Sequence, residues 1–380
     1  MTREEAVALA RRHAPIFWLH EREAFLPRDC KIVVEISDLY RRGERVDDAR
    51  QPKGLDDLGR VQNSEDCYLK IRDLDMKEFT IPVAYHKAIP ESGPEAVGHL
   101  ARVKYGDDFD SRGIPTDDPH LPKYYARISK ASISPRPGDP FTEYYSGADP
   151  GVFGDYTLIE YFFYYVFNDA WNKHQGDWDS MVRLYTKDDR TYMVTHMHGA
   201  RWLSQWPSST PDLGTWLDEW NHLKEREIGK AYVLDGHPYI FIALGAHGCY
   251  PTPGFTIHGL DLPGIISRDD VIVTTDQRQI GRLCILPDSV SEELVRTNLR
   301  VSDVEVNKIR FGRWKGPELI DQQPWLKYKG LWGDDTQYRG WDGPRQPPVT
   351  REPDASGLKD VLQFHKGYES GAVLKSRHEV

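Results

Sequence analysis

The strongest candidate for chemistry is a polar run, NKHQGDWD, that contains His174, Asp177 and Asp179. Side chains two residues apart on a strand share a face, so a strand here would place both carboxylates side by side. Such carboxylates repel each other unless a cation, a proton or water lies between them, and His174 can reach them across the turn that Gly176 permits. One imidazole and two carboxylates suit Mg²⁺, Ca²⁺, Mn²⁺ or Fe²⁺ better than structural zinc. The alternative is a solvated strand end, with Trp178 in the core.

Three further histidines could transfer protons beside such an ion. His196 and His198 are two residues apart and would share a strand face, while His247 ends the apolar run PYIFIAL between two glycines. A polar KDDR turn separates MVRLYT from RTYMV, which predicts a hairpin that brings THMHG beside HQGDWD. The alternative interpretation is a cross-strand polar pair for His196 and His198, and a structural role for His247.

Several classes of protein are disfavoured by what the sequence contains. It has no G-x-G-x-x-G, Walker, G-x-S-x-G or H-E-x-x-H motif, which argues against the usual nucleotide-binding, serine-hydrolase and zincin families. The formal net charge of −10 disfavours a broad nucleic-acid interface. The longest strongly apolar run, Tyr161 to Phe167, is too short to span a bilayer. Four scattered cysteines, Cys249 among them as a buried thiol, and the lack of a secretory signal predict a reduced, cytoplasmic protein.

The elements that must position these residues are mostly strands. Aromatic residues make up 12% of the 380 residues, and short aromatic and β-branched runs separated by Gly, Pro and Asp turns fill residues 156–285. This pattern predicts a mainly β protein, an antiparallel β-sandwich with a few short helices. A helix is expected at 3–13 with Thr2 as its N-cap, and a long loop at 135–155.

The sequence predicts one large domain over residues 1–345. Two polar stretches rich in charge, Gly, Pro and Asp, near 41–66 and 86–122, are expected to be insertions on its surface and not a second core. Residues 346–380 contain few large apolar side chains and are expected to form a loosely ordered tail.

With these motifs in their order, the chain resembles the Vps62 family of vacuolar-sorting-associated proteins. The opening HAPIFWLHEREAFLP, the aromatic strand YFFYYVFN, the signature HQGDWD, the segment PYIFIALGAHGCYPTPG and the terminal GLWGDD and GPRQPP each resemble a family element. Together they cover most of residues 10–348. The resemblance implies a fold and a site, but no particular reaction.

The spacing His-x-x-Asp-x-Asp is also similar to the metal signature of necrosis-inducing (NPP1-type) proteins, which are β-sandwiches with a divalent cation. That resemblance implies His174, Asp177 and Asp179 as ligands, with Asn168 or Asp169 as an upstream oxygen donor. The usual Glu is Asp179 in this chain, one methylene shorter, so the metal would shift inward, a water would fill the gap, or the site is retuned or lost.

Three functions follow from these features. The first is a divalent-metal-dependent enzyme, such as a hydrolase, lyase or cyclase, that acts on a small organic or lipid-like substrate, with His196, His198 or His247 as proton-transfer groups. The second is a module in which the cation orders a loop that binds a glycan or a lipid headgroup. The third is a non-catalytic trafficking or scaffold protein in which the histidines only pack.

Overall fold

The computed structural model describes the chain in thirteen segments: 1–19, 26–72, 122–168, 174–178, 181–188, 190–197, 200–205, 229–242, 247–251, 254–258, 268–272, 283–299 and 309–334. The expected insertion at 86–122 lies outside these residues except for Pro122, and the expected tail at 346–380 lies outside them entirely.

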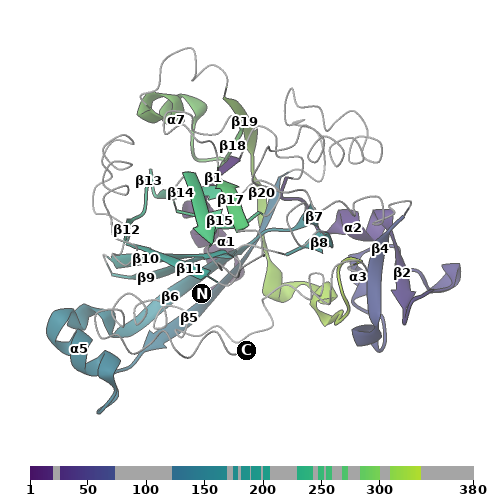
Figure 1. Ribbon diagram of the computed structural model, residues 1–380, viewed down its shortest axis with the longest axis horizontal. Helices are drawn as coiled ribbons and strands as arrows, with labels where there is room; N and C mark the ends of the chain where they lie inside the picture. The colour runs from purple at the N-terminus through teal and green to yellow at the C-terminus, as the bar shows by residue number, and fades with distance from the viewer. Residues whose placement is uncertain are drawn as a thin grey trace.

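Two sheets form the centre of the protein (Figure 1). The first sheet has the order β13–β14–β1–β18–β19, with β15 paired to β14: β1 Ile16–Leu19, β13 Val233–Leu234, β14 His237–Ile242, β15 Cys249–Tyr250, β18 Leu283–Leu286 and β19 Arg310–Arg313. The second sheet has the order β12–β11–β10–β9–β6–β5–β20: β5 Lys123–Ile133, β6 Gly154–Phe162, β9 Met181–Lys187, β10 Arg190–Met197, β11 Ala200–Gln205, β12 Gly229–Lys230 and β20 Lys315–Leu319.

The prediction of a mainly β protein is confirmed, but the sheets are mixed rather than purely antiparallel. The second sheet is antiparallel at its centre, where β9 and β10 form the expected hairpin, and parallel at both ends. In the first sheet, β1 pairs in parallel with β14, and β18 with β19. These parallel pairs, such as that between β1 and β14, join segments separated by many residues, so no hairpin turn in the sequence announces them.

Three small sheets complete the β-structure. They are β3–β2–β4 (β2 Ser37–Arg41, β3 Glu44–Arg45, β4 Cys67–Ile71), β16–β17 (Gly254–His258 and Arg268–Ile272) and β7–β8 (Tyr165–Asn168 and His174–Asp177). The stretch 41–66 contains β3 and short helices, and its Leu58 is buried in the shared core described below.

In the described part of the chain the helices are few and short. The α-helices are α1 Arg3–Arg12, α2 Lys31–Ile36, α3 Leu55–Leu58, α5 Pro140–Ala148 and α7 Glu292–Leu299; the 3₁₀ helices are η1 Asp48–Arg50, η2 Ser64–Asp66, η5 Pro150–Val152, η6 Ile320–Gln322 and η7 Pro324–Lys327. Helix α1 begins at the expected N-cap, Thr2, which also forms a capping box: Thr2 and Glu5 exchange side chain–backbone hydrogen bonds. No helix in the described segments is long and apolar enough to cross a membrane.

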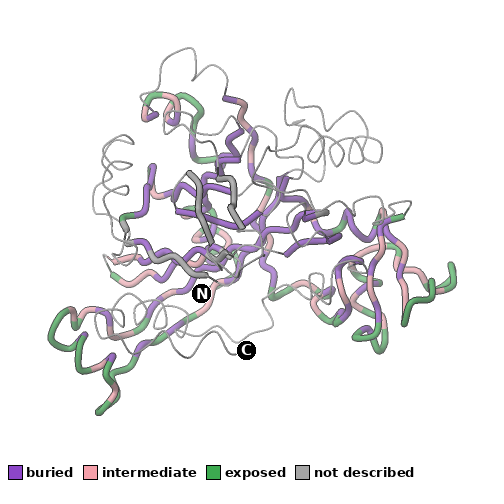
Figure 2. The backbone as a smooth tube through the Cα atoms, viewed as in Figure 1, coloured by how far each residue is buried: buried purple, intermediate pink, exposed green. Residues whose placement is uncertain are grey.

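Alternation along the strands separates a shared core from two outer ones. Figure 2 shows that the central strands are largely buried. Phe17 of β1 and Ile159 of β6 belong to one cluster that draws on both large sheets. Their neighbours point the other way: Trp18 packs in a second cluster with residues of α7, and Leu158 in a third with residues of α5. Successive strand residues thus bury opposite faces of each sheet.

Helix α5 replaces part of the loop expected at 135–155. Asp139 accepts a hydrogen bond from the backbone N–H of Phe141, and Pro140 occupies the first helical turn, where it needs no intrahelical acceptor. Phe141 and Tyr145, four residues apart, are buried on the outer face of the second sheet. The loop prediction was wrong because the Pro-rich composition outweighed this start signal.

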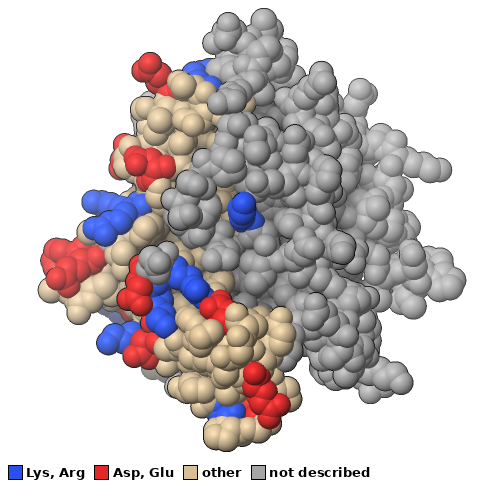
Figure 3. Space-filling view, turned by 90° about the vertical axis from the view of Figure 1, so that its left-hand side faces the viewer, with Lys and Arg blue, Asp and Glu red and all other residues tan. Residues whose placement is uncertain are grey.

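Over the described part of the face in Figure 3, Lys and Arg side chains are interspersed with Asp and Glu.

Two histidines fasten the end of α1 to the turn between β13 and β14. His13 Nδ1 lies 3.1 Å from the carbonyl oxygen of Gly236, and His237 Nδ1 lies 2.8 Å from that of Ala14. Burial lowers the pKa of both histidines, and the backbone hydrogen bonds only partly oppose it. Both rings are therefore neutral in the folded protein at neutral pH.

Stability is expected to fall as the pH drops below about 6.5, the ordinary histidine value. The unfolded chain takes up protons there that the folded chain does not, so each histidine contributes a slope of at most about 1.4 kcal/mol per pH unit between its two pKa values. Urea unfolding at pH 7.5, 6.5 and 5.5 measures the slope. His13→Gln, whose amide can still donate to Gly236, should flatten it; an equal slope in this variant would contradict the assignment.

Candidate functional site

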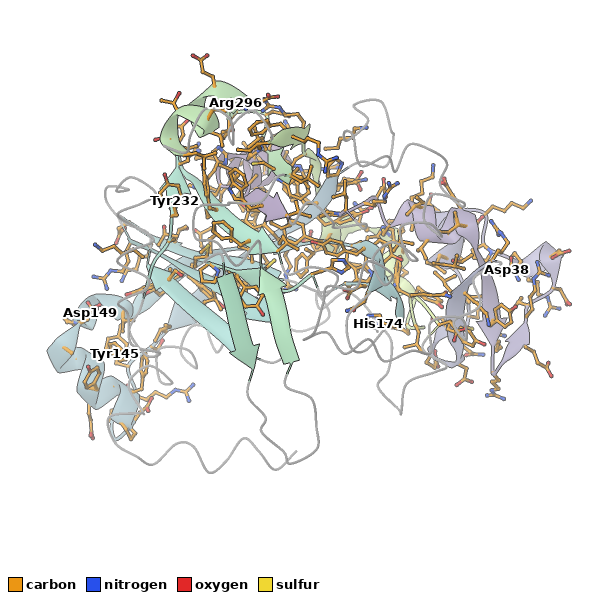
Figure 4. The ribbon with its side chains drawn as sticks, turned by 45° about the horizontal axis from the view of Figure 1, so that its top comes forward. Asp38, Tyr145, Asp149, His174, Tyr232 and Arg296 are labelled. Atoms are coloured by element: carbon orange, nitrogen blue, oxygen red, sulfur yellow. The ribbon has the colours of Figure 1, made fainter. Side chains whose placement is uncertain are left out.

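A short hairpin carries the residues with the predicted chemistry. β7 and β8 pair antiparallel, with Asn168 opposite His174 and Tyr165 opposite Asp177. The buried Gln175 side chain accepts a hydrogen bond of 2.8 Å from the backbone N–H of Ile71, which ties β8 to β4 of the small sheet. Figure 4 shows His174 between the large sheets and the small sheet that carries Asp38.

Two glycines let β8 lie directly against the backbone of residues 332–334. Gly176 has φ +65°, and a Cβ atom there would lie 2.0 Å from the carbonyl oxygen of Trp332. A Cβ atom at Gly333 would lie 1.6 Å from the carbonyl oxygen of Gln175. The motifs HQGD and WGD, distant in the sequence, therefore form one structural unit in which only glycine fits.

Asp177 is the centre of the site. Its side chain is buried, and its Oδ2 lies 3.0 Å from His247 Nδ1 and 3.4 Å from Asn168 Nδ2. Its other oxygen, Oδ1, lies 3.7 Å from His174 Nε2. Two imidazoles, one carboxylate and one amide thus converge from β7, β8 and the segment before β15.

The charge of Asp177 is stabilised by its neighbours. Burial by itself raises the pKa of this carboxyl, but His174 and His247 outweigh it and hold the pKa well below its ordinary value. Because a carboxylate only accepts hydrogen bonds, His247 must carry its proton on Nδ1 in order to donate to Oδ2.

Two contacts fix the position of the His247 ring: the hydrogen bond to Asp177 and the stacking on Tyr165. It is fully buried and adopts φ +56°, an uncommon conformation for a residue with a Cβ atom. Its ring stacks on that of Tyr165, with centroids 3.8 Å apart and planes within 3° of parallel. The sequence predicted His247 as a proton-transfer group, and the structure adds its direct bond to Asp177.

Trp178, the residue after Asp177, packs in an aromatic cluster at the end of the hairpin. Its ring stacks on Trp325 with centroids 5.5 Å apart, meets Trp332 edge-on at 5.5 Å and lies 5.0 Å from Tyr164. Trp178 therefore lies in the core and packs against the C-terminal segment, which β8 contacts through its glycines.

One predicted pairing was wrong. β8 pairs with β7 rather than with the strand that contains His196, and β9 begins only at Met181. His196 lies on β10 opposite Arg201 of β11, and its side chain is not described. The prediction placed Asp177 on the strand that continues into MVRLYT, but Asp177 ends β8 and Trp178 belongs to no strand.

The remaining predicted residues divide into two groups. The structure brings together His174, Asp177, Asn168 and His247, whereas Asp169, Asp179 and His198 lie outside the described residues. Sequence reasoning missed Tyr165, whose only signal was its place in the aromatic run before Asn168. All four cysteines are buried, which confirms the prediction of burial for Cys249.

Within the described segments, no group of three or more His, Cys, Asp and Glu side chains forms a complete metal site. Two of the predicted ligands, His174 and Asp177, are described and lie close enough together to share an ion. The 3.7 Å between His174 Nε2 and Asp177 Oδ1 is too long for a hydrogen bond, yet shorter than twice a ligand–metal distance of about 2.1 Å. Further oxygen donors would have to come from Asp169 or Asp179.

Comparison with known proteins identifies no relative of the chain. No family model, no curated protein and no solved structure matches the chain. The chemistry of the site therefore has to be derived from its own residues.

Proposed function

We propose that the protein is a divalent-metal-dependent enzyme that acts on a small organic or lipid-like substrate. The observation that carries this proposal is the buried, ionised carboxylate of Asp177 between two histidines and an amide. Burying a carboxylate is costly unless charged or hydrogen-bonding partners surround it, so such clusters concentrate at functional sites.

His174 and Asp177 would hold the cation through Nε2 and Oδ1, with Asp179 and Asn168 or Asp169 as the other donors. This mixture of one nitrogen and hard oxygens favours Mg²⁺, Ca²⁺ or Mn²⁺ over Zn²⁺. Such an ion would supply Lewis-acid polarisation of a substrate oxygen or a more acidic bound water.

The other residues would position these ligands. His247 donates to Asp177 Oδ2 at 3.0 Å and leaves Oδ1 to face His174, and the stacked Tyr165 ring fixes the imidazole plane. This division of one carboxylate between an orienting hydrogen bond and a metal is the usual arrangement around bound ions. His196 and His198 stay candidates for proton transfer to the substrate.

Several coarser features support related proposals. Apolar side chains of both large sheets meet in one core, which supports a β-sandwich. The motif order supports membership of the Vps62 family, and four buried cysteines outside any disulfide support a reducing, cytoplasmic location. The aromatic side chains around the hairpin support an apolar, small or lipid-like ligand.

Metal binding is the direct test. Calorimetric titration of EDTA-treated, dialysed protein with Mn²⁺ should give about one site, and Asp177→Asn and His174→Ala should abolish it. His247→Gln should weaken the affinity by about 10–100-fold, the usual effect of losing an orienting partner. Asp149→Asn is the matched control, because Asp149 pairs with Arg190 at 2.6 Å at the end of α5, far from His174 in Figure 4.

Each outcome separates the candidate functions. Wild-type protein that binds none of Mn²⁺, Mg²⁺ and Ca²⁺ would overturn the proposal and favour the non-catalytic trafficking protein. Cation-dependent binding to lipid vesicles or glycans, without turnover of any ester or lipid substrate, would favour the binding module instead.

A further inference from the structure

A second pair of chemically reactive side chains lies away from the Asp177 site. Ser289 Oγ is 2.8 Å from His237 Nε2; this contact and the His237–Ala14 hydrogen bond bring together the end of α1, the start of β14 and the turn between β18 and α7. The histidine is buried, whereas Ser289 is exposed on its turn. The hydroxyl of an exposed residue thus contacts a buried base whose other ring nitrogen bonds to the Ala14 carbonyl.

His237 is in the tautomer that can accept the proton of the Ser289 hydroxyl. The carbonyl oxygen of Ala14 only accepts hydrogen bonds, so the 2.8 Å contact requires the proton of His237 on Nδ1. Nε2 of the neutral ring is then the acceptor for the Ser289 hydroxyl. Burial lowers the pKa of His237, which keeps this ring neutral at pH 7.

We propose that Ser289 is a nucleophile activated by His237, with the Ala14 carbonyl orienting the base, and that this dyad takes the acyl group of small, neutral esters. A nucleophile within hydrogen-bond reach of a base that a third group orients is the general form of such sites. It is recognised by geometry and not by a sequence motif, so the absence of a G-x-S-x-G elbow does not bear on it.

The step balances within the dyad, the ester and water. Ser289 Oγ bonds to the acyl carbon while its proton moves to His237 Nε2; the ester C–O bond breaks, and the leaving alcohol takes that proton. Water then attacks the acyl-serine, passes a proton through His237 to Ser289 Oγ, and releases the carboxylic acid.

The charges around the turn select the substrate. Asp288, Glu292 and Glu293 are all exposed within four residues of Ser289, and they disfavour an anionic acyl group. Arg313 donates to the backbone carbonyls of Pro287 and Val290, so its charge is held by the turn itself. The first-turn N–H groups of α7 have no intrahelical acceptor and are the nearest donors along the chain for an oxyanion.

The test uses the full chain with p-nitrophenyl acetate, a neutral ester, in the presence of EDTA. Release of nitrophenol should be accompanied by an acetyl group on the peptide that contains Ser289, identified by mass spectrometry. Ser289→Ala should abolish this adduct and lower the rate at least 100-fold. Ser146→Ala is the matched control: this exposed serine lies on α5, which packs against the second sheet, so the rate should stay unchanged.

His237→Gln should lower the rate as much as Ser289→Ala does. If that variant fails to fold, Ser289→Ala still decides, because an exposed hydroxyl is removed there without loss of core. A chain that carries no acetyl group on Ser289, or that hydrolyses the ester equally well as Ser289→Ala, overturns the proposal. EDTA separates this result from the metal-dependent function, which would fail under the same conditions.

Discussion

Replacing Glu160 with Gln is expected to lower the free energy of unfolding by about 3–5 kcal/mol. Glu160 is fully buried on β6 and lies between two arginines in register with it, Arg127 on β5 and Arg183 on β9. Arg127 Nε lies 2.5 Å from Oε2, and Arg183 Nε lies 3.0 Å from Oε1. The neutral amide would leave two guanidinium groups in a low-dielectric site without the carboxylate that compensates them.

Urea unfolding at constant m-value measures this loss. The matched control is Asp66→Asn, which breaks an ion pair of 2.7 Å with Arg42 whose two side chains are 41% and 79% exposed. An exposed pair contributes roughly 0–1 kcal/mol, so this variant should remain close to the wild type. A triple replacement, Arg127→Met with Glu160→Leu and Arg183→Leu, should recover stability because no uncompensated charge is left. A loss below 1 kcal/mol in Glu160→Gln would contradict the account.

The sequence predicts what depends on local pattern. The N-cap at Thr2 and the β9–β10 hairpin around KDDR each have their signal within a dozen residues. The alternation of Leu158 and Ile159 between two cores follows from the strand period in the same way.

Contacts between distant segments cannot be predicted from local pattern. His174 and Asp177 could be chosen from their spacing, but nothing in the sequence placed His247 at 3.0 Å from Asp177 or β8 beside β7. The contact of β8 with residues 332–334 runs through backbone atoms, so it leaves no side-chain pattern, only two glycines among 31. Ser289 and His237 are 52 residues apart in the sequence and also meet only in the folded chain.

That backbone contact yields the second large effect: Gly333→Ala should destabilise the protein by about 3 kcal/mol and also disrupt the metal site. The added Cβ atom would lie 1.6 Å from the carbonyl oxygen of Gln175, and a backbone atom cannot move aside as a flexible side chain can. β8 must therefore shift away from the C-terminal segment, and it carries His174 and Asp177 with it.

Gly147→Ala gives the matched control, since a Cβ atom there, in helix α5, would meet nothing within 4 Å. The same substitution at that position should be neutral or stabilise by about 0.5–1 kcal/mol, because alanine loses less entropy in a helix than glycine does. Urea unfolding and Mn²⁺ titration of both variants separate a general loss of stability from a displaced hairpin. If Gly333→Ala were as stable as the wild type and bound Mn²⁺ equally well, the close packing of HQGD on WGD would not be what positions Asp177. If it were folded but bound Mn²⁺ weakly, the two motifs would be coupled through their backbones, because no side chain at position 333 could account for the change.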